Sequence, residues 1–326
     1  MKKNVLLIVL LPALAACSTE PDDSGAFYVP VEVETRGADG DPVETQVLAF
    51  TGSGRLAAYS KGAPAGLRLR RGVNYDILAL SGCPDVNLEG LSSRSAVEAV
   101  NMGLGEYDDP GTGFAASASS RITLTGTAAR SISLAADRYV CRIRLVSVKN
   151  GLPPSMGSVV LKNAFLSNVV ASQTIGAAGS GWLNPMGRAG ETPPAEGHVI
   201  DGVTYKASAP GLTFRRYGTR LQYGTTLDTG SDFYCYPNPT VTDATGFSAV
   251  MGPRFTRLVL SVEIDGILHY YPVSIVRPER NSSYDISVTI SNYGSDDPEK
   301  PLSPGAMTIE TTMTGWVVED EIQTNF

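Results

Sequence analysis

The chain has 326 residues, of which 42% are hydrophobic and 18% are charged, and its formal net charge is −7. The hydrophobic fraction is sufficient for folded cores and excludes a disordered protein. The acidic balance, with no basic run longer than three residues, excludes the surface that a nucleic-acid partner needs. With 34 glycines and 21 prolines, the composition favours many short strands joined by turns.

The first seventeen residues have the pattern of a bacterial export signal. Two lysines precede an apolar run, Val5 to Ala16, which is too short to cross a bilayer as a helix. The run ends in Leu-Ala-Ala-Cys, which resembles a lipoprotein cleavage box. That resemblance implies that residues 1–16 are removed and that Cys17 is lipidated, whereas an ordinary secretory signal with a chance cysteine is the alternative. Two or more acyl chains would anchor the chain stably to a membrane.

Residues 17–26 are polar, acidic and rich in turn formers, and they predict a flexible tether. An acidic run directly after a lipidated cysteine resembles the surface-export signal of Bacteroidetes lipoproteins. The resemblance implies a lipoprotein on the outer face of the outer membrane.

Three cysteines, Cys83, Cys141 and Cys235, are left once Cys17 is lipidated. An odd number gives no complete disulfide framework, and no CxxC pair supports a structural zinc site. We expect mostly buried thiols that act as small apolar side chains. A Cys83–Cys141 bridge within the first domain is the main alternative.

Strand-type alternation recurs along the chain, and helical periodicity is confined to residues 93–101. In the first alternating run, residues 28–35, the side chains of Val29, Val31 and Val33 share one face. Further strands are predicted at residues 47–50, 55–59, 66–70, 75–80, 122–124, 131–134, 139–148, 158–170, 233–236, 257–264, 267–275, 283–290 and 307–318. Asp265-Gly266 between two of these runs predicts a hairpin.

The order of these runs predicts an all-β chain of two antiparallel β-sandwiches in tandem. We place the first domain at residues 27–150 and the second at 151–326, with Gly151-Leu152-Pro153-Pro154 as the linker. Residues 174–229 have little periodicity and predict long surface loops with isolated short strands.

No motif of catalysis is present in the sequence. His198 and His269, the only histidines, have no nucleophile, zinc or phosphate-binding motif beside them, so we expect neither an enzyme nor a cofactor or metal site. The pairs Asp108-Asp109 and Asp296-Asp297 lack the spaced oxygen ligands of a calcium loop, and solvated turn residues are the favoured interpretation. Trp182 in a loop could stack on a sugar, but an aromatic in that setting more often covers a local core.

The C-terminal third carries a resemblance to a known family. Residues 279–290, Glu-Arg-Asn-Ser-Ser-Tyr-Asp-Ile-Ser-Val-Thr-Ile, are followed by Gly-Ser-Asp-Asp-Pro-Glu-Lys-Pro-Leu at residues 294–302 and by Gly-Trp-Val-Val at residues 315–318. This ending resembles that of the fimbrillins, the fimbria subunits of Bacteroidales. The similarity is strong over about residues 234–316 and weaker in the first domain.

The resemblance implies two transthyretin-like β-sandwiches that assemble by donor-strand exchange. In this family a surface protease that cuts after arginine removes the first strand, and a strand of the next subunit takes its place. Arg36 falls at the cleavage position, so Val29, Val31 and Val33 belong to the displaced strand. The donor candidate is the strand near residues 308–318, with Ile309, Thr311 and Met313 on one face, or the tail 319–326.

The implied partners are other fimbrial subunits in a head-to-tail polymer, an Arg-specific surface protease and the outer membrane, reached through lipid. The resemblance favours a stalk or tip subunit that contributes to adhesion. Two alternatives stay open: a surface glycan-binding lipoprotein, and a fimbrial anchor subunit in which Arg36 ends a permanent strand.

Overall fold

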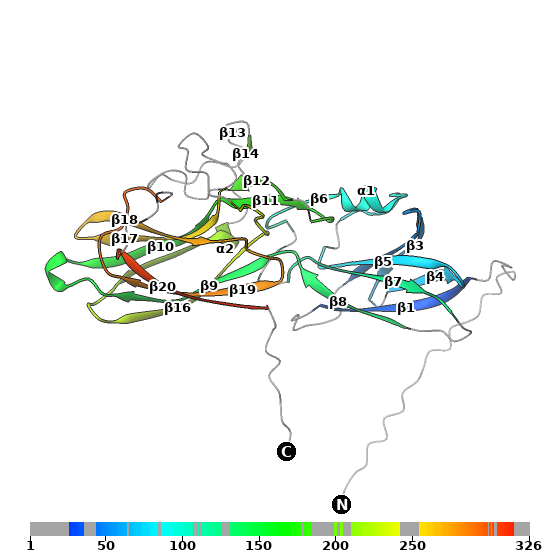
Figure 1. Cartoon of the computed structure of the whole chain (residues 1–326), viewed down its shortest axis with the longest axis horizontal. Helices are drawn as coiled ribbons and strands as arrows, with labels where there is room; N and C mark the ends of the chain where they lie inside the picture. Colours follow the sequence, from blue (N-terminus) through cyan, green and yellow to red (C-terminus); the bar gives the residue numbers. More distant parts are fainter. Residues whose placement is uncertain are drawn as a thin grey trace, which may run out of the picture.

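The computed structural model describes residues 26–35, 44–63, 65–83, 86–106, 108, 110, 113–125, 131–177, 179–183, 199–200, 203–204, 210–241, 254–298, 300, 302 and 305–315. Most of these residues form strands. The strands make two groups, which lie one after the other along the long axis of the molecule (Figure 1). The predicted all-β class is confirmed.

The first group is one seven-stranded sheet with the order β3-β2-β5-β7-β8-β1-β4. Its strands are β1 (Ala26–Thr35), β2 (Thr45–Thr51), β3 (Leu56–Gly62), β4 (Ala65–Arg70), β5 (Asn74–Ser81), β7 (Ala116–Thr123) and β8 (Ile132–Arg138). Strand β1 pairs with β4 on one side and with β8 on the other, so among the described strands it alone connects β4, the last strand of this order, to the rest of the sheet.

Strands β2 and β5 are buried on both faces, which explains their nearly continuous apolar sequences. On one face, Val47 and Ile77 pack into a core shared with β4, whereas on the other face Leu48 and Leu78 belong to a larger core that continues into the second group. A strand between two apolar layers loses the polar half of its alternation.

The predicted helix is present as α1 (Arg94–Glu98). Ser93 caps it by accepting a hydrogen bond from the backbone N–H of Ala96, at 3.2 Å, and Val97 is fully buried. The short helix therefore covers part of the larger core.

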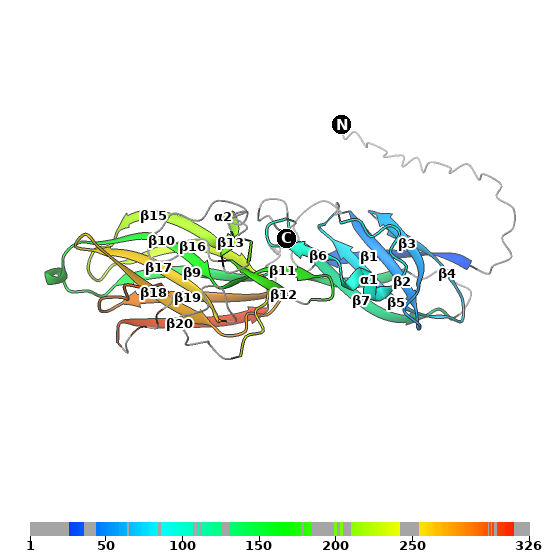
Figure 2. The same ribbon diagram turned by 90° about the horizontal axis from the view of Figure 1, so that it is seen from above.

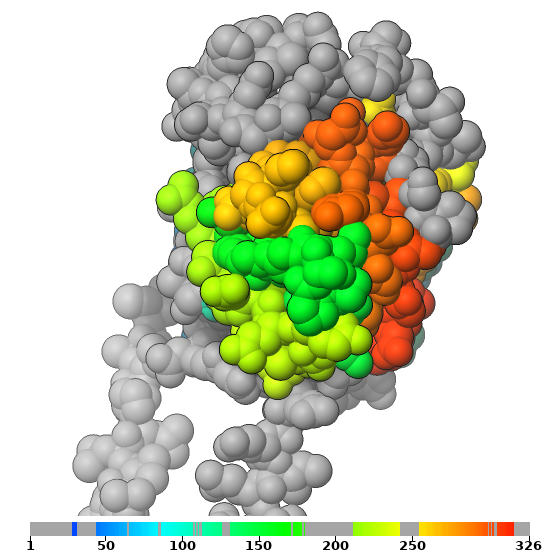
Figure 3. Space-filling view, turned by 90° about the vertical axis from the view of Figure 1, so that its left-hand side faces the viewer, coloured from blue at the N-terminus to red at the C-terminus, as the bar shows by residue number. Residues whose placement is uncertain are grey.

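The second group contains two four-stranded sheets, β15-β10-β17-β18 and β16-β9-β19-β20. Their strands are β9 (Cys141–Asn150), β10 (Val159–Ser167), β15 (Phe214–Arg220), β16 (Thr226–Cys235), β17 (Thr256–Ile264), β18 (Ile267–Ile275), β19 (Ser282–Ile290) and β20 (Met307–Gly315). Inward-facing residues of both sheets, such as Ile143 and Leu260, form the core. The connections β9–β10, β15–β16 and β17–β18 close one end of the molecule (Figure 3).

The hairpin predicted at Asp265-Gly266 is confirmed. Both residues have positive φ, 49° and 83°, and Ile264 lies opposite Ile267 in the ladder of β17 and β18. Two residues in this conformation make the turn whose twist matches that of the strands.

Strand β9 pairs with β16 and β19, within the second group, whereas the sequence pattern predicted residues 141–150 as the end of the first domain. The alternation of a strand indicates which side chains are buried but not which strands become its neighbours. The segment Gly151–Pro154 therefore connects β9 to β10 inside the second group, through the 3-10 turn η1 (Pro154–Met156). The limits of the two domains and their transthyretin-like topology stay predictions.

A small sheet joins the two groups. It contains β6 (Asn101–Gly103), β11 (Val169–Thr174) and β12 (Gly179–Leu183), and β6 comes from the chain between strands of the first group (Figure 2). The two remaining strands and the second helix are β13 (Val199–Ile200), β14 (Val203–Thr204) and α2 (Pro210–Thr213). The larger core extends from Leu48 to Ile290 without interruption, so the two groups share a hydrophobic interior.

Candidate assembly site

Strand β1 lies between β4 and β8 and pairs with both. We call the space that it occupies between these two strands the β1 slot. Residues 26–31 pair antiparallel with β4, and residues 31–35 pair parallel with β8. Among the described strands, β4 pairs only with β1, and β8 pairs otherwise only through Arg138 and Asp137. Without a strand in the slot, most backbone groups on the facing edges of β4 and β8 would lose their partners.

The β1 slot also covers a hydrophobic core. Val29 is completely buried beside Leu67 and Leu69 of β4 and Leu134 of β8. Val31 lies opposite Ala65 and Ile132, and Val33 lies opposite Leu134. The first of the three predicted displaced residues is therefore a core residue, and the other two occupy the same strand at alternate positions.

One side chain of β1 fills a gap left by a glycine. Tyr28 is 55% exposed, and its ring lies over Gly66 so closely that a Cβ there would fall 1.8 Å from the Tyr28 hydroxyl oxygen. Any residue larger than glycine at position 66 would displace the ring. The outer face of the β1 slot thus has a notch at Gly66.

Strand β20 has the opposite character. It pairs along all nine residues with β19, from Ser282 opposite Gly315 to Ile290 opposite Met307, and it is the edge strand of its sheet. Every residue of β20 after Met307 is exposed, with Ile309 at 40% and Met313 at 61%. Figure 3 shows β20 along one side of the surface.

The exposed apolar residues of β20 are on its inner face. Ile309, Thr311 and Met313 lie opposite Val288, Ile286 and Tyr284 of β19, which are buried in the larger core. Directly opposed residues share a face of the sheet, so β20 continues the apolar face of β19 beyond the area that the facing sheet covers. Backbone hydrogen bonds therefore provide most of what holds β20, and burial of apolar area adds little.

The two groups of predicted residues lie in different sheets. Val29, Val31 and Val33 belong to the first group of strands, whereas Ile309, Thr311 and Met313 belong to the edge of the second. Cys17, Arg36, His198 and Asp109 lie outside the described residues.

Sequence reasoning missed a junction between the groups, built from Arg280 and Asn281 in the turn before β19. The Arg280 guanidinium donates hydrogen bonds to the carbonyl oxygens of Asp137, at 2.6 Å, and Arg138, at 3.3 Å, and to Ser117 Oγ, at 3.2 Å. It also lies 4.5 Å above the ring centre of Tyr139. Arg280 thus ties the second group to β7 and β8 of the first.

Asn281 completes this junction. Its amide donates to Asp137 Oδ1 at 2.8 Å, and its backbone N–H donates to the Val140 carbonyl oxygen at 3.0 Å. Its φ of 56° lies in the left-handed region that asparagine tolerates better than most residues. The Arg-Asn pair of the C-terminal sequence signature therefore has a structural role at the boundary between the groups.

Asp108 is the clearest correction among the candidate metal ligands. It was expected in solvent, yet it is buried, and Tyr236 donates its hydroxyl hydrogen to Asp108 Oδ2 at 3.0 Å. The backbone N–H of Ala115 donates to Oδ1 at 3.3 Å. Burial raises the pKa of this carboxyl to about 6, although these hydrogen bonds act in the opposite direction. Nothing in the sequence around Asp108 and Asp109 indicated Tyr236, 128 residues further along, as a partner.

Apart from the cysteines, the remaining residues that the sequence singled out and the structure describes are Asp296, Asp297, His269 and Trp182. The Asp296 side chain is 91% exposed and 3.9 Å from the Lys300 ammonium, and the backbone N–H of Asp297 donates to Ser295 Oγ. The His269 ring, in β18, lies 5.1 Å from that of Tyr293. Trp182 lies in β12 opposite Val170 rather than in a loop.

The part of the chain that the structure describes brings no three metal-binding side chains together. In the same residues no helix has the length and hydrophobicity required to cross a membrane.

The Cys83–Cys141 bridge is not formed. All three described cysteines are buried thiols, as the favoured interpretation predicted, and Cys141 faces Cys235 instead. Cys83 Sγ donates to the carbonyl oxygen of Ser81, at 3.4 Å.

Comparison with known proteins identifies the fold. No protein-family model matches the sequence, and a search of curated proteins by sequence finds no match. Solved structures do match. The chain is similar to a fimbrillin of Porphyromonas gingivalis W83, with a TM-score of 0.64 and 17% identity over 91% of this chain and 99% of that one.

Candidate cell adhesion proteins give similar values. One from Bacteroides eggerthii has a TM-score of 0.62 and 16% identity, covering 89% of this chain and 96% of that one. One from Parabacteroides distasonis has a TM-score of 0.61 and 14% identity, covering 91% and 99%. The chain therefore has the fold of these proteins over nearly its whole length, as the resemblance in sequence predicted.

Proposed function

We propose that this chain is a subunit of a cell-surface fimbria that polymerises by strand exchange and contributes to adhesion. It would be exported as an outer-membrane lipoprotein through Cys17 and would need no catalytic residue. The fold shared with a fimbrillin and candidate adhesion proteins supports the class of function. One observation carries the mechanism: a strand near one end of the chain, β1, that is paired on both sides and buries Val29, and an exposed edge strand of nearly equal length near the other, β20.

Cleavage after Arg36 would make β1 a separate peptide. While β1 is part of the chain, its effective concentration in the slot is high, and a strand from another molecule cannot compete. After the cut this advantage is lost. An empty slot would expose Leu67, Leu69 and Leu134 and the free edges of β4 and β8, which favours capture of another strand.

The donor in this proposal is β20 of the next molecule. Nine residues can replace most of the ten in β1, and Ile309, Thr311 and Met313 alternate as Val29, Val31 and Val33 do. Leaving β19 costs β20 little buried apolar area, because its residues after Met307 are already exposed. Each molecule has one slot and one donor at different sites, so the contact is head-to-tail and produces a filament.

The experiment is assembly of the full chain after treatment with an Arg-specific protease, followed by negative-stain electron microscopy. Wild type should form filaments, and N-terminal sequencing should find Gly37 as the new first residue. Arg36→Ala and Arg36→Lys should stay monomeric and folded. Arg220→Ala, at an exposed arginine that ends β15, is the matched control and should assemble normally.

Normal filaments from Arg36→Ala, with residues 26–35 still attached to the chain, would overturn the proposal. A chain without residues 308–326 should be cut at Arg36 yet fail to polymerise. If that chain forms filaments, β20 is not the donor.

A further inference from the structure

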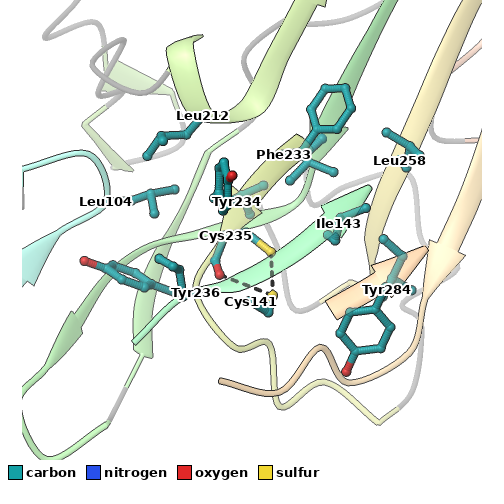
Figure 4. Packing of buried hydrophobic residues seen from close by; sticks show 14 of the residues in the cluster. Leu104, Cys141, Ile143, Leu212, Phe233, Tyr234, Cys235, Tyr236, Leu258 and Tyr284 are labelled. Carbon is teal, nitrogen blue, oxygen red and sulfur yellow. Dashed lines mark hydrogen bonds between the residues drawn. The ribbon is translucent and has the colours of Figure 1, made fainter. Parts of the chain in front are cut away.

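Two thiols meet in the core of the second group. Cys141 is the first residue of β9 and Cys235 is the last of β16, and the two are directly opposite in the antiparallel ladder. Their Sγ atoms are 3.3 Å apart, and Cys141 Sγ is also 3.3 Å from the Cys235 carbonyl oxygen (Figure 4). Both side chains are completely buried, among Ile143, Phe233 and Tyr284.

The backbone geometry at this pair suits a covalent bond. Opposed residues of an antiparallel ladder have Cα atoms about 4.5–5.5 Å apart, which lies within the range of about 4.4–6.8 Å that disulfides span. Sulfur atoms at 3.3 Å are already in contact, so a small rotation of the two side chains would bring them to bonding distance. Strand movement is not required.

We propose that Cys141 and Cys235 are joined by a disulfide in the exported protein. The inference rests on export, which residues 1–17 predict, because disulfides persist in extracytoplasmic compartments and are rare in the cytosol. It does not depend on fimbrial assembly. Cys83 takes no part, since its thiol lies at a different place in the core, where it donates a hydrogen bond to the carbonyl oxygen of Ser81.

The bond would form by exchange with a disulfide of the extracytoplasmic space, carried by a protein or a small molecule. The thiolate of one cysteine attacks the oxidant's disulfide, and the thiolate of the other then attacks the mixed disulfide. One S–S bond breaks and one forms. The two cysteines lose two protons and two electrons, and the oxidant becomes two thiols.

Burial determines when this exchange takes place. The attacking species is the thiolate, and the hydrogen bond to Cys141 and burial hold the pKa of Cys235 well above its ordinary value. In the folded protein neither sulfur is accessible to an oxidant or a reductant. The disulfide therefore forms before the end of the β9–β16 ladder closes, and afterwards it resists reduction until the protein unfolds.

The bond would hold an edge strand. Among the described strands, β16 pairs only with β9, and its first seven residues are exposed or half-buried. The disulfide would close a loop from residue 141 to residue 235 and would reduce the freedom of the unfolded chain accordingly.

The test is a thiol map of the full chain produced through its own export signal. The protein is denatured in urea with N-ethylmaleimide and without reductant, and its peptides are identified by mass spectrometry. We expect one linked peptide pair containing Cys141 and Cys235, and Cys83 with the alkyl group. The Cys83→Ala variant should keep the link. Alkylation of both Cys141 and Cys235 in the exported wild type, or a link to Cys83, would overturn the proposal.

A second measurement does not rely on cysteine variants folding. Thermal unfolding is measured on two samples of the exported protein. The first is the protein as purified. The second is reduced in urea, refolded without alkylation and kept in dithiothreitol. The oxidised form should melt roughly 3–8 °C higher, the range expected for one disulfide in a chain of this size. Equal melting temperatures would refute the role of the disulfide in holding β16.

Discussion

Asp108 shows how a single residue can make stability depend on pH. Its folded-state pKa of about 6 is above the ordinary 3.8, mainly because the carboxyl is buried. A raised pKa favours the protonated folded state. The contribution of Asp108 protonation to the free energy of unfolding is therefore complete below about pH 4, and it is lost as the pH rises through about 6.

We expect Asp108→Asn to remove this loss. Between pH 4 and 7 the variant should gain stability relative to wild type, by on the order of 2–3 kcal/mol at most, because asparagine does not ionise. Thermal unfolding across this pH range measures the effect. Asp296→Asn, in an exposed turn, is the control and should follow wild type. A constant difference between Asp108→Asn and wild type over the whole range would contradict the assignment.

Tyr236→Phe should have the opposite sign. The hydroxyl donates to the Asp108 carboxylate, so its loss should cost more stability at pH 7 than at pH 4. The same series of melting curves provides the comparison.

At the scale of elements, the donor role of β20 can be tested by comparing substitutions on its two faces. Both faces are exposed in the single molecule, so substitutions on either should leave the fold intact. In the β1 slot, however, one face would be buried where Val29 is now.

We expect Ile309→Asp with Met313→Asp to abolish donor activity, because two carboxylates would enter an apolar core. The matched control is Thr308→Asp with Thr312→Asp, which places the same charges on the other face of the same strand. Filament length after protease treatment, measured by electron microscopy, compares the two. If the double variants lose or keep assembly equally, the proposed orientation of β20 is wrong.

Alternation was sufficient to predict strands that have one buried and one exposed face. It failed where burial follows from neighbours in space. The range 174–229 was expected to be long loops with isolated short strands, yet β15 and the first part of β16 are paired strands of the two four-stranded sheets, with sequences as polar as Thr226-Leu-Asp-Thr-Gly-Ser-Asp. These residues are strands because β10 and β9 offer them unpaired edges. Similarly, the small residues of β7 carried almost no apolar pattern before Ile122.

For the candidate assembly site, too, the sequence predicted the strands but not the neighbours that surround them. The sequence indicated a first strand with Val29, Val31 and Val33 on one face, and in the structure that strand is present and Val29 is buried, whereas its displacement stays a prediction. No periodicity could indicate that β20 is uncovered on both faces, because exposure depends on where the facing sheet ends. Pairings between distant residues, such as Arg280 with Asp137 and Cys141 with Cys235, were inaccessible for the same reason.

At the scale of the whole molecule, the shared core predicts that the two groups of strands unfold together. The larger cluster includes Leu48 from the first group and Ile290 from the last long strand, and β6 pairs with β11 across the boundary. Calorimetry of the full chain should therefore show one transition rather than two.

Arg280→Ala should lower the temperature of that transition, because it removes three hydrogen bonds and the contact with Tyr139 at the junction. We expect a loss on the order of 2 kcal/mol. Arg280→Lys should recover only part of it, since an ammonium cannot reach three acceptors in the geometry of a guanidinium. Two transitions in wild type, or an unchanged midpoint in Arg280→Ala, would show that the groups are independent.

The two-sided pairing of the β1 slot has a mechanical consequence. A strand there is hydrogen-bonded to β4 over one half and to β8 over the other, with the bonds running across its axis. Tension along that axis would have to shear both ladders at once, whereas tension across an edge strand breaks bonds one after another. A strand seated in this slot is therefore suited to bear load, and β20 at its edge is suited to be peeled away.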